Sequence, residues 1–230
     1  MPVKLFILGL PGSGKSAIAR YISSKIYAEG QHWTATRFND YKILDNMFHQ
    51  DTGGRFKPAE SGGFDVLDLK VFDEALQTLE QEVNRYIDTL KPEGKKLVLI
   101  EFSRNNYHHA FQLLNRSFLT HAYFLHFHAE VEVCKKRIQH RVAEPRFEED
   151  DHPVSDYIFE NYYYGDDGEH LAEILTSDYK VDGQRVLIVN NNGSLQEVLG
   201  GIIAFIDTMF EDEVRSRNVS PFISKGEEAK

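Results

Sequence analysis

The residue pattern with the clearest chemistry lies near the amino terminus. It reads G-x-x-x-x-G-K-[ST], and its members are Gly9, Leu10, Pro11, Gly12, Ser13, Gly14, Lys15 and Ser16. Glycines in such a loop let the backbone adopt positive φ angles and turn its N–H groups toward an anion. The lysine reaches the β- and γ-phosphates of a nucleotide, and the hydroxyl that follows it holds Mg²⁺. The pattern therefore predicts a phosphate-binding loop.

The residues on both sides of this loop support the prediction. An apolar run of strand length, residues 3–8, precedes it, and apolar residues recur at helical spacing over residues 17–26. A helix that begins at the loop directs the positive end of its dipole toward a bound phosphate. The chain has no Asn-Lys-x-Asp guanine signature, so we predict ATP, together with Mg²⁺, as the bound cofactor.

A carboxylate follows the second predicted strand. Residues 32–38 are predicted to be extended, and they lead into Asn39 and Asp40. Residues at the carboxyl ends of strands in an open α/β sheet face the ligand crevice. Asp40 is therefore a candidate for a substrate contact or a general base. The alternative is that Asn39 or Asp40 caps a helix predicted for residues 41–48.

Another carboxylate and an arginine lie at the end of the third predicted strand, residues 96–102. Glu101 at this place would hold Mg²⁺ beside the phosphates, or it would take a proton from an acceptor hydroxyl. Arg104 follows closely enough to contact a substrate or the phosphate in transfer. The alternative is an internal Glu101–Arg104 ion pair that takes no part in chemistry.

Three further arginines fit a closing segment. Arg137 and Arg141 lie four residues apart on one face of a helix predicted for residues 130–142, and Arg146 follows in the next loop. Such a segment closes on phosphates and excludes water. The alternative is a surface helix whose arginines pair with neighbouring glutamates.

The composition limits the class of protein. The chain has 230 residues with 41% hydrophobic content, which suits one α/β domain with an insert. The net charge of −10 argues against nucleic-acid binding, which relies on Lys and Arg to neutralise phosphates. The single cysteine, Cys134, excludes an internal disulfide and a cysteine-rich metal site. With no leader segment or membrane span recognised, we expect a soluble, cytoplasmic protein.

The remaining pattern alternates strands with helices, which predicts a parallel sheet covered by helices on both faces. Helices are predicted for residues 68–90, 107–119, 130–142 and 154–164 and from Ser194 onward, and strands for residues 122–127 and 186–189. We expect a single domain over residues 1–210, with a substrate-side loop at about 50–65 and a lid at about 137–168. A polar tail, residues 211–230, is expected to follow it.

The form G-x-P-G-S-G-K-S of the loop, with Glu101 and Arg104 after an apolar strand, resembles the adenylate-kinase-type group of P-loop nucleoside and nucleotide kinases. The resemblance covers about residues 1–210. It implies a three-layer α/β/α P-loop NTPase fold with a parallel sheet and a lid-like insert, of which Arg137 and Arg141 form the arm. It also implies that the turn containing Asn191 lies beside the adenine.

The residues and the resemblance together predict an ATP- and Mg²⁺-dependent kinase whose acceptor is an unidentified small molecule, nucleoside or nucleotide. Nucleoside monophosphate kinases usually carry Asp-Gly-x-Pro-Arg at the third strand, and this chain has Glu-Phe-Ser-Arg, which favours a different small molecule. Two alternatives remain: a nucleotide-binding regulatory ATPase, and a kinase of RNA or polynucleotide ends, against which the net charge counts.

Overall fold

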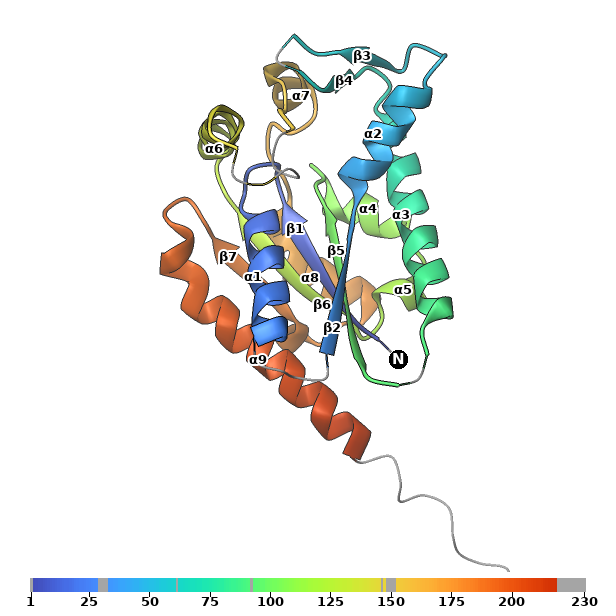
Figure 1. The fold of residues 1–230 in the computed structure, drawn as a ribbon, viewed down its shortest axis with the longest axis vertical. Coiled ribbons are helices and arrows are strands. Elements are labelled where there is room, and N and C mark those ends of the chain that lie inside the picture. Colours follow the sequence, from blue (N-terminus) through green and yellow to red (C-terminus); the bar gives the residue numbers. More distant parts are fainter. Residues whose placement is uncertain are drawn as a thin grey trace, which may run out of the picture.

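The computed structural model describes residues 2–28, 33–60, 62–91, 93–145, 147 and 152–218, with side chains up to residue 212. A five-stranded sheet runs through the centre (Figure 1), and its strand order is β2-β5-β1-β6-β7. All neighbouring strands in it are parallel. The predicted α/β class with a parallel sheet is therefore confirmed.

The elements follow one another in strand–helix alternation. The sheet strands are β1 (Val3–Gly9), β2 (Trp33–Asn39), β5 (Lys95–Phe102), β6 (Tyr123–His128) and β7 (Val186–Asn190). The helices are α1 (Lys15–Ala28), α2 (Asp40–Gln50), α3 (Lys70–Thr89), α4 (Tyr107–Gln112), α5 (Arg116–Leu119), α6 (Val131–Ala143), α7 (Asp156–Asn161), α8 (Leu171–Tyr179) and α9 (Leu195–Asn218). Two short 3₁₀ helices, η2 (Gly168–His170) and η3 (Gly183–Arg185), flank α8.

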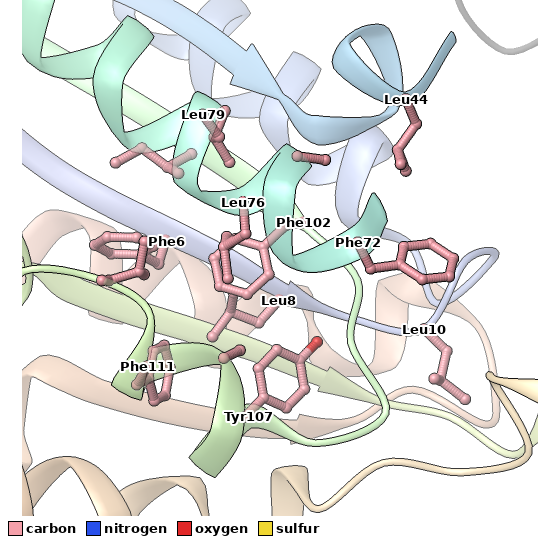
Figure 2. Packing of buried hydrophobic residues seen from close by; sticks show 14 of the residues in the cluster. Phe6, Leu8, Leu10, Leu44, Phe72, Leu76, Leu79, Phe102, Tyr107 and Phe111 are labelled. Atoms are coloured by element: carbon pink, nitrogen blue, oxygen red, sulfur yellow. The ribbon is translucent and has the colours of Figure 1, made fainter. Parts of the chain in front are cut away.

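Apolar side chains on the two faces of the sheet form two separate cores. On one face, Leu5 and Ile7 of β1 pack with α1 and α9. On the other face, Phe6 and Leu8 pack against α3, α4 and α8. Figure 2 shows this second core, with aromatic rings from β1, β5, α3 and α4 around Leu8 and Leu76. The alternation along β1 thus produces the middle layer of a three-layer molecule.

The register of the strands brings three chain segments to one edge of the sheet. Ile7 of β1 lies beside Glu101 of β5, and Asn39 of β2 lies on the other side of Glu101. The glycine-rich loop leaves β1 at this edge, and Asp40 opens α2 there. The sheet therefore places the loop and both predicted carboxylates at its carboxyl edge.

Two predicted segments differ from the structure. The predicted substrate-side loop contains a hairpin of β3 (Phe56–Pro58) and β4 (Phe64–Val66), whose three-residue strands are too short to show alternation. The helix predicted over residues 107–119 is divided into α4 and α5. The cause is Glu80 of α3, a buried carboxylate that accepts hydrogen bonds from the backbone and side-chain nitrogens of Asn115.

Two differences concern the carboxyl-terminal part. Helix α8 was not predicted, and it fills the connection between α7 and β7. The predicted tail begins at Glu211, whereas α9 continues to Asn218, and residues 219–230 lie outside the described residues. None of the described helices is both long enough and apolar enough to cross a membrane.

Phe6 tests the packing of the second core. Its ring is fully buried and stacks on Phe124 with centroids 4.9 Å apart. We expect Phe6→Ala to lower the free energy of unfolding by about 3–5 kcal/mol, because it removes a buried ring and leaves a cavity. Tyr27→Ala, at a residue that is 91% exposed, should change it by no more than about 0.5 kcal/mol. Urea denaturation of both variants measures the difference, and equal effects would contradict this description of the core.

Candidate active site

The glycine-rich loop has the backbone geometry that an anion cradle requires. Gly9 and Gly12 have φ angles of +132° and +84°. A Cβ on Gly9 would lie 2.5 Å from the carbonyl oxygen of Phe127, and one on Gly12 would lie 2.5 Å from that of Cys134. Both positions therefore need glycine for conformation and for space. Helix α1 begins at Lys15, directly after the loop.

Two side chains hold the loop from outside. The hydroxyl of Tyr107 accepts a hydrogen bond from the N–H of Gly9 at 2.6 Å. The amide of Asn191, only 2% exposed, donates to the carbonyl of Ser13 at 2.7 Å. The resemblance had suggested that the Asn191 turn lies beside the adenine; here this side chain contacts the loop backbone itself. Tyr107 was not recognised in the sequence, because a buried tyrosine there looks like ordinary core packing.

The side chain of Lys15 folds back over the glycine-rich loop. Its ammonium donates to the carbonyls of Gly9 and Leu10 at 2.8 and 2.9 Å and to the hydroxyl of Ser103 at 2.8 Å. Burial lowers the pKa of Lys15 to about 8, and the charges of Glu101 and Asp40 oppose that shift. A buried cation with carbonyl partners is well placed to exchange those partners for phosphate oxygens.

Glu101 lies beside Ser16, and its ion-pair partner is Arg37. The hydroxyl of Ser16 is 3.4 Å from Oε2 of Glu101. Arg37 of β2 donates from Nη2 to Ser16 Oγ at 2.9 Å and to Glu101 Oε2 at 3.1 Å, and from Nε to Glu101 Oε1. Burial raises the pKa of Glu101, and the charges of Arg37 and Lys15 oppose the rise. The alternative of a Glu101–Arg104 ion pair is therefore wrong.

Arg104 pairs with Asp40. Its side chain is 2% exposed, and Nη1 lies 2.5 Å from Oδ2 of Asp40. Nη2 donates to the carbonyl of Phe72 on α3 at 2.6 Å. Burial lowers the pKa of Arg104, but the charge and hydrogen bond of Asp40, together with Tyr162 and Tyr163, raise it above its usual value. Arg104 is thus enclosed by protein and acts on the site through Asp40.

For Asp40 the two alternatives were a carboxylate that faces the ligand crevice and a helix cap supplied by Asn39 or Asp40. The side chain of Asn39 caps α2, because its Oδ1 accepts from the N–H of Tyr41 at 2.6 Å. Asp40 is the first residue of α2 and makes no such cap. Its carboxylate instead lines a cavity next to the glycine-rich loop.

This cavity of about 270 Å³ brings most of the predicted residues together. Its loop end is lined by Pro11, Gly12, Gly14, Lys15 and Ser16, and its walls include Asp40, Glu101, Arg137 and Arg141. Its lining also includes Tyr41, Leu44, Phe64, Val66, Phe72 and Tyr163, of which Phe64 and Val66 belong to the hairpin β3-β4, which lies away from the loop in Figure 1. The other predicted site residues that the structure describes do not line the cavity. They are Gly9, Leu10, Ser13, Arg104 and Asn191.

The described residues of the predicted lid are held to the rest of the protein at both ends of the segment. Arg137 and Arg141 line the cavity, and their Nη2 atoms donate to the carbonyls of Gly193 and His152. At the far end of the segment, Asp167 accepts hydrogen bonds from the backbone N–H groups that begin α4. Arg146 lies outside the described residues.

Comparisons with known proteins find a similarity of fold, to solved structures. No protein-family model matches the chain, and no curated protein does. Among solved structures, Kti12 of Chaetomium thermophilum in complex with ADP-AlF3 is 17% identical with a TM-score of 0.53, over 90% of this chain and 98% of that one. The APS kinase CysC of Mycobacterium tuberculosis, in complex with AMPPNP and APS, is 16% identical with a TM-score of 0.50 over the same shares. A putative kinase from Chloroflexus aurantiacus is 14% identical, also with a TM-score of 0.50 and the same coverage.

The chain has the P-loop kinase fold. The matches extend over nine-tenths of its length. At these identities the likeness establishes the architecture, and the reaction must be argued from the site.

Asp166 tests the anchor at the end of the predicted lid. It is 3% exposed, and its Oδ2 lies 3.3 Å from Nε2 of the buried His126 on β6. Burial raises the pKa of Asp166, but the hydrogen bond and charge of His126, together with the hydrogen bond from the N–H of Gly168, hold it below its usual value. Because the folded-state pKa is depressed, this carboxylate stabilises the fold above its unfolded pKa, about 3.9, and loses the effect as pH falls through the lower folded value.

We therefore expect Asp166→Asn to lower the free energy of unfolding at pH 7 by about 1–3 kcal/mol. The difference from the unmodified protein should shrink as pH falls below about 4. Urea titrations from pH 3 to pH 7 measure it. Asp178→Asn, at an aspartate whose side chain is 50% exposed beside His108, is the control. A difference that stays constant over the whole range would count against the pairing.

Proposed function

We propose that this protein is an ATP- and Mg²⁺-dependent phosphotransferase that acts on a hydroxyl of a small molecule. The observation that carries the proposal is that one cavity is lined by the lysine and serine of the loop, by Glu101 and by Asp40. These are an anion cradle, a pair of oxygen ligands for a cation and a candidate base, which together are the parts that phosphoryl transfer needs.

The residues present fit magnesium. The Ser16 hydroxyl and the Glu101 carboxylate lie 3.4 Å apart, and both are the hard oxygen donors that Mg²⁺ prefers. Within the described part of the chain, no group of three His, Cys, Asp or Glu residues forms a metal cage. Mg²⁺ in such sites keeps water and substrate phosphates as its other ligands. When bound there, it offsets charge on the phosphates of ATP.

The lysine and arginine side chains that line the cavity come from two helices, α1 and α6. Lys15 and the loop N–H groups hold the β- and γ-phosphates, assisted by the dipole of α1. Arg137 and Arg141, on α6, also line the cavity and offset the charge that develops on the transferring group. Both arginines now bond to backbone carbonyls, which they exchange for phosphate oxygens when the nucleotide is bound.

Asp40 is the base in this proposal. The acceptor oxygen attacks the γ-phosphorus, the bond to the ADP oxygen breaks, and the acceptor proton passes to the free carboxylate oxygen of Asp40. Arg104 is a positioning residue, because its guanidinium fixes the other oxygen of Asp40. Glu101 is committed to Ser16 and Arg37, which leaves it the metal side of the reaction.

The far end of the cavity indicates the kind of acceptor. It is built from rings and branched side chains: Tyr41 stacks on Phe64 with centroids 5.8 Å apart and on His152 at 3.7 Å, and Leu44, Val66 and Phe72 complete the walls. The nearby cations of the hairpin are paired with acids, Arg55 with Glu74 and Lys57 with Asp65. An alcohol with an apolar, ring-bearing body and no phosphate group matches this surface best.

Two substitutions separate nucleotide binding from chemistry. We expect Lys15→Ala to weaken ATP affinity about 10- to 100-fold, because it removes a charge-assisted hydrogen bond. Asp40→Asn keeps the shape of the side chain but not the base, so ATP affinity should stay within about twofold while acceptor-dependent ADP formation falls about 10²- to 10⁴-fold. Calorimetry and a coupled ADP assay measure the two quantities.

Asp45→Asn is the matched control, because Asp45 lies on the same helix α2 with a side chain 41% exposed. Full ADP formation by Asp40→Asn would overturn the assignment of the base. ATP hydrolysis that no ring-bearing alcohol stimulates, in a panel that also contains sugar phosphates and oligonucleotides, would favour the regulatory ATPase instead.

Phe64 tests the acceptor end. Phe64→Ala removes one wall of the apolar surface, so the acceptor KM should rise about tenfold, since burying an aromatic ring is worth about 1.5–3 kcal/mol at most. The KM for ATP should not change, because Phe64 lies away from the loop. Leu67→Ala is the control, at an exposed residue directly after β4. An equal rise in both KM values would contradict the division of the cavity.

A further inference from the structure

The guanidinium of Arg37 bridges the two groups to which the proposed function assigns magnesium. It donates to the Ser16 hydroxyl at 2.9 Å and contacts both oxygens of Glu101, through Nε and Nη2. A bidentate contact of this kind fixes a carboxylate in position as well as neutralising it. Arg37 thus makes, with a single positive charge, the two contacts that a divalent cation would make.

The position of Arg37 follows from the sheet. Strand β2 pairs with β5, so that Arg37 lies beside Leu99 and Asn39 lies beside Glu101. The arginine side chain reaches along the strand direction to the carboxylate two positions further on. The Glu101 side chain is 1% exposed and that of Arg37 is 21% exposed, and Glu101 lines the cavity whereas Arg37 does not. A buried carboxylate needs such a partner whenever no other cation is present.

Metal and guanidinium compete for the same place. Mg²⁺ binds its oxygen ligands at about 2.0–2.1 Å and demands near-octahedral geometry. The N–H groups of Arg37 are directed at both Ser16 Oγ and Glu101 Oε2, so a cation that takes both oxygens as ligands competes with these hydrogen bonds. The repulsion between the two cations is strong at this separation because the carboxylate between them is shielded from water.

We propose that Arg37 is a positioning residue that holds the place of the divalent cation in the nucleotide-free protein and releases Glu101 when the metal arrives with nucleotide phosphates. The proposal rests on the proposed function for the identity of the metal ligands. It makes metal binding conditional on nucleotide: the free cation meets Arg37, whereas the nucleotide-bound cation brings phosphate oxygens that supply its remaining ligands and offset its charge.

A purely structural role for Arg37 predicts something different. If Arg37 only stabilised Glu101, its removal would lower the stability of the fold and leave the affinity for a free divalent cation unchanged. If Arg37 holds the cation's place, its removal uncovers the site. The affinity of the nucleotide-free protein for the metal alone therefore separates the two roles.

Mn²⁺, detected by electron paramagnetic resonance, is the probe. We expect the nucleotide-free protein to bind Mn²⁺ weakly, Arg37→Met to bind it at least about tenfold more tightly, and Arg37→Lys to resemble the unmodified protein because the charge remains. Adding Glu101→Gln to Arg37→Met should abolish the gain, which places the metal at Glu101. With AMPPNP present, the unmodified protein should bind Mn²⁺ tightly. The Mn²⁺ affinity of Arg37→Met should then exceed that of the unmodified protein by much less than about tenfold.

The controls make failure informative. Arg37→Gln, which keeps polar contacts, replaces Arg37→Met if circular dichroism shows that the methionine variant is unfolded. A folded variant that lacks the guanidinium and binds free Mn²⁺ no better than the unmodified protein overturns the role of Arg37, and tight Mn²⁺ binding with AMPPNP then leaves the proposed function standing. Absence of Mn²⁺ binding even with AMPPNP overturns the metal site and the proposed function together.

Discussion

The arrangement of this site depends on the burial of one carboxylate. Glu101 is nearly inaccessible to water, and an isolated buried charge would cost several kcal/mol. The protein offsets that cost with Arg37 from β2 and with Lys15 and Ser16 from the helix that follows β1. Strand β5 lies between β2 and β1 in the sheet. The carboxylate of Glu101 on β5 therefore contacts side chains from β2 and from the helix after β1, at the edge where the loop leaves the sheet.

A second buried ion pair, between Arg104 and Asp40, lies at the same edge of the sheet. Arg104 joins Asp40 to the carbonyl of Phe72 on α3, so the carboxylate is fixed relative to the helical layer as well as to the sheet. The two acids therefore have different partners: Glu101 pairs with Arg37 beside Ser16, and Asp40 pairs with Arg104. The proposed function uses this separation when it assigns one acid to the metal and the other to the base.

Local patterns carried much of the prediction. The loop residues Gly9–Ser16 were identifiable because the strand before them and the helix after them are contiguous in sequence, and Glu101 could be placed because its apolar strand has a clear end. Arg37 was missed, although it lies inside a predicted strand, because its partner is 64 positions away in the chain. Arg104 was placed in the site on proximity in sequence, while its burial and its pairing with Asp40 depend on α3, which sequence spacing does not position. The hairpin β3-β4 and helix α8 were missed because short strands and short helices show too little periodicity.

The most direct test of the central claim is a crystal structure of the protein with Mg²⁺ and a non-hydrolysable ATP analogue. The account predicts that the γ-phosphate contacts Lys15 Nζ, that Ser16 Oγ lies about 2.0–2.1 Å from the metal, and that Arg37 has left the Ser16 hydroxyl and no longer holds both oxygens of Glu101. It also predicts that the γ-phosphorus faces Asp40 across the apolar end of the cavity. A nucleotide bound in the loop with its γ-phosphate directed away from Asp40, and with Arg37 still bridging Ser16 and Glu101, would contradict it.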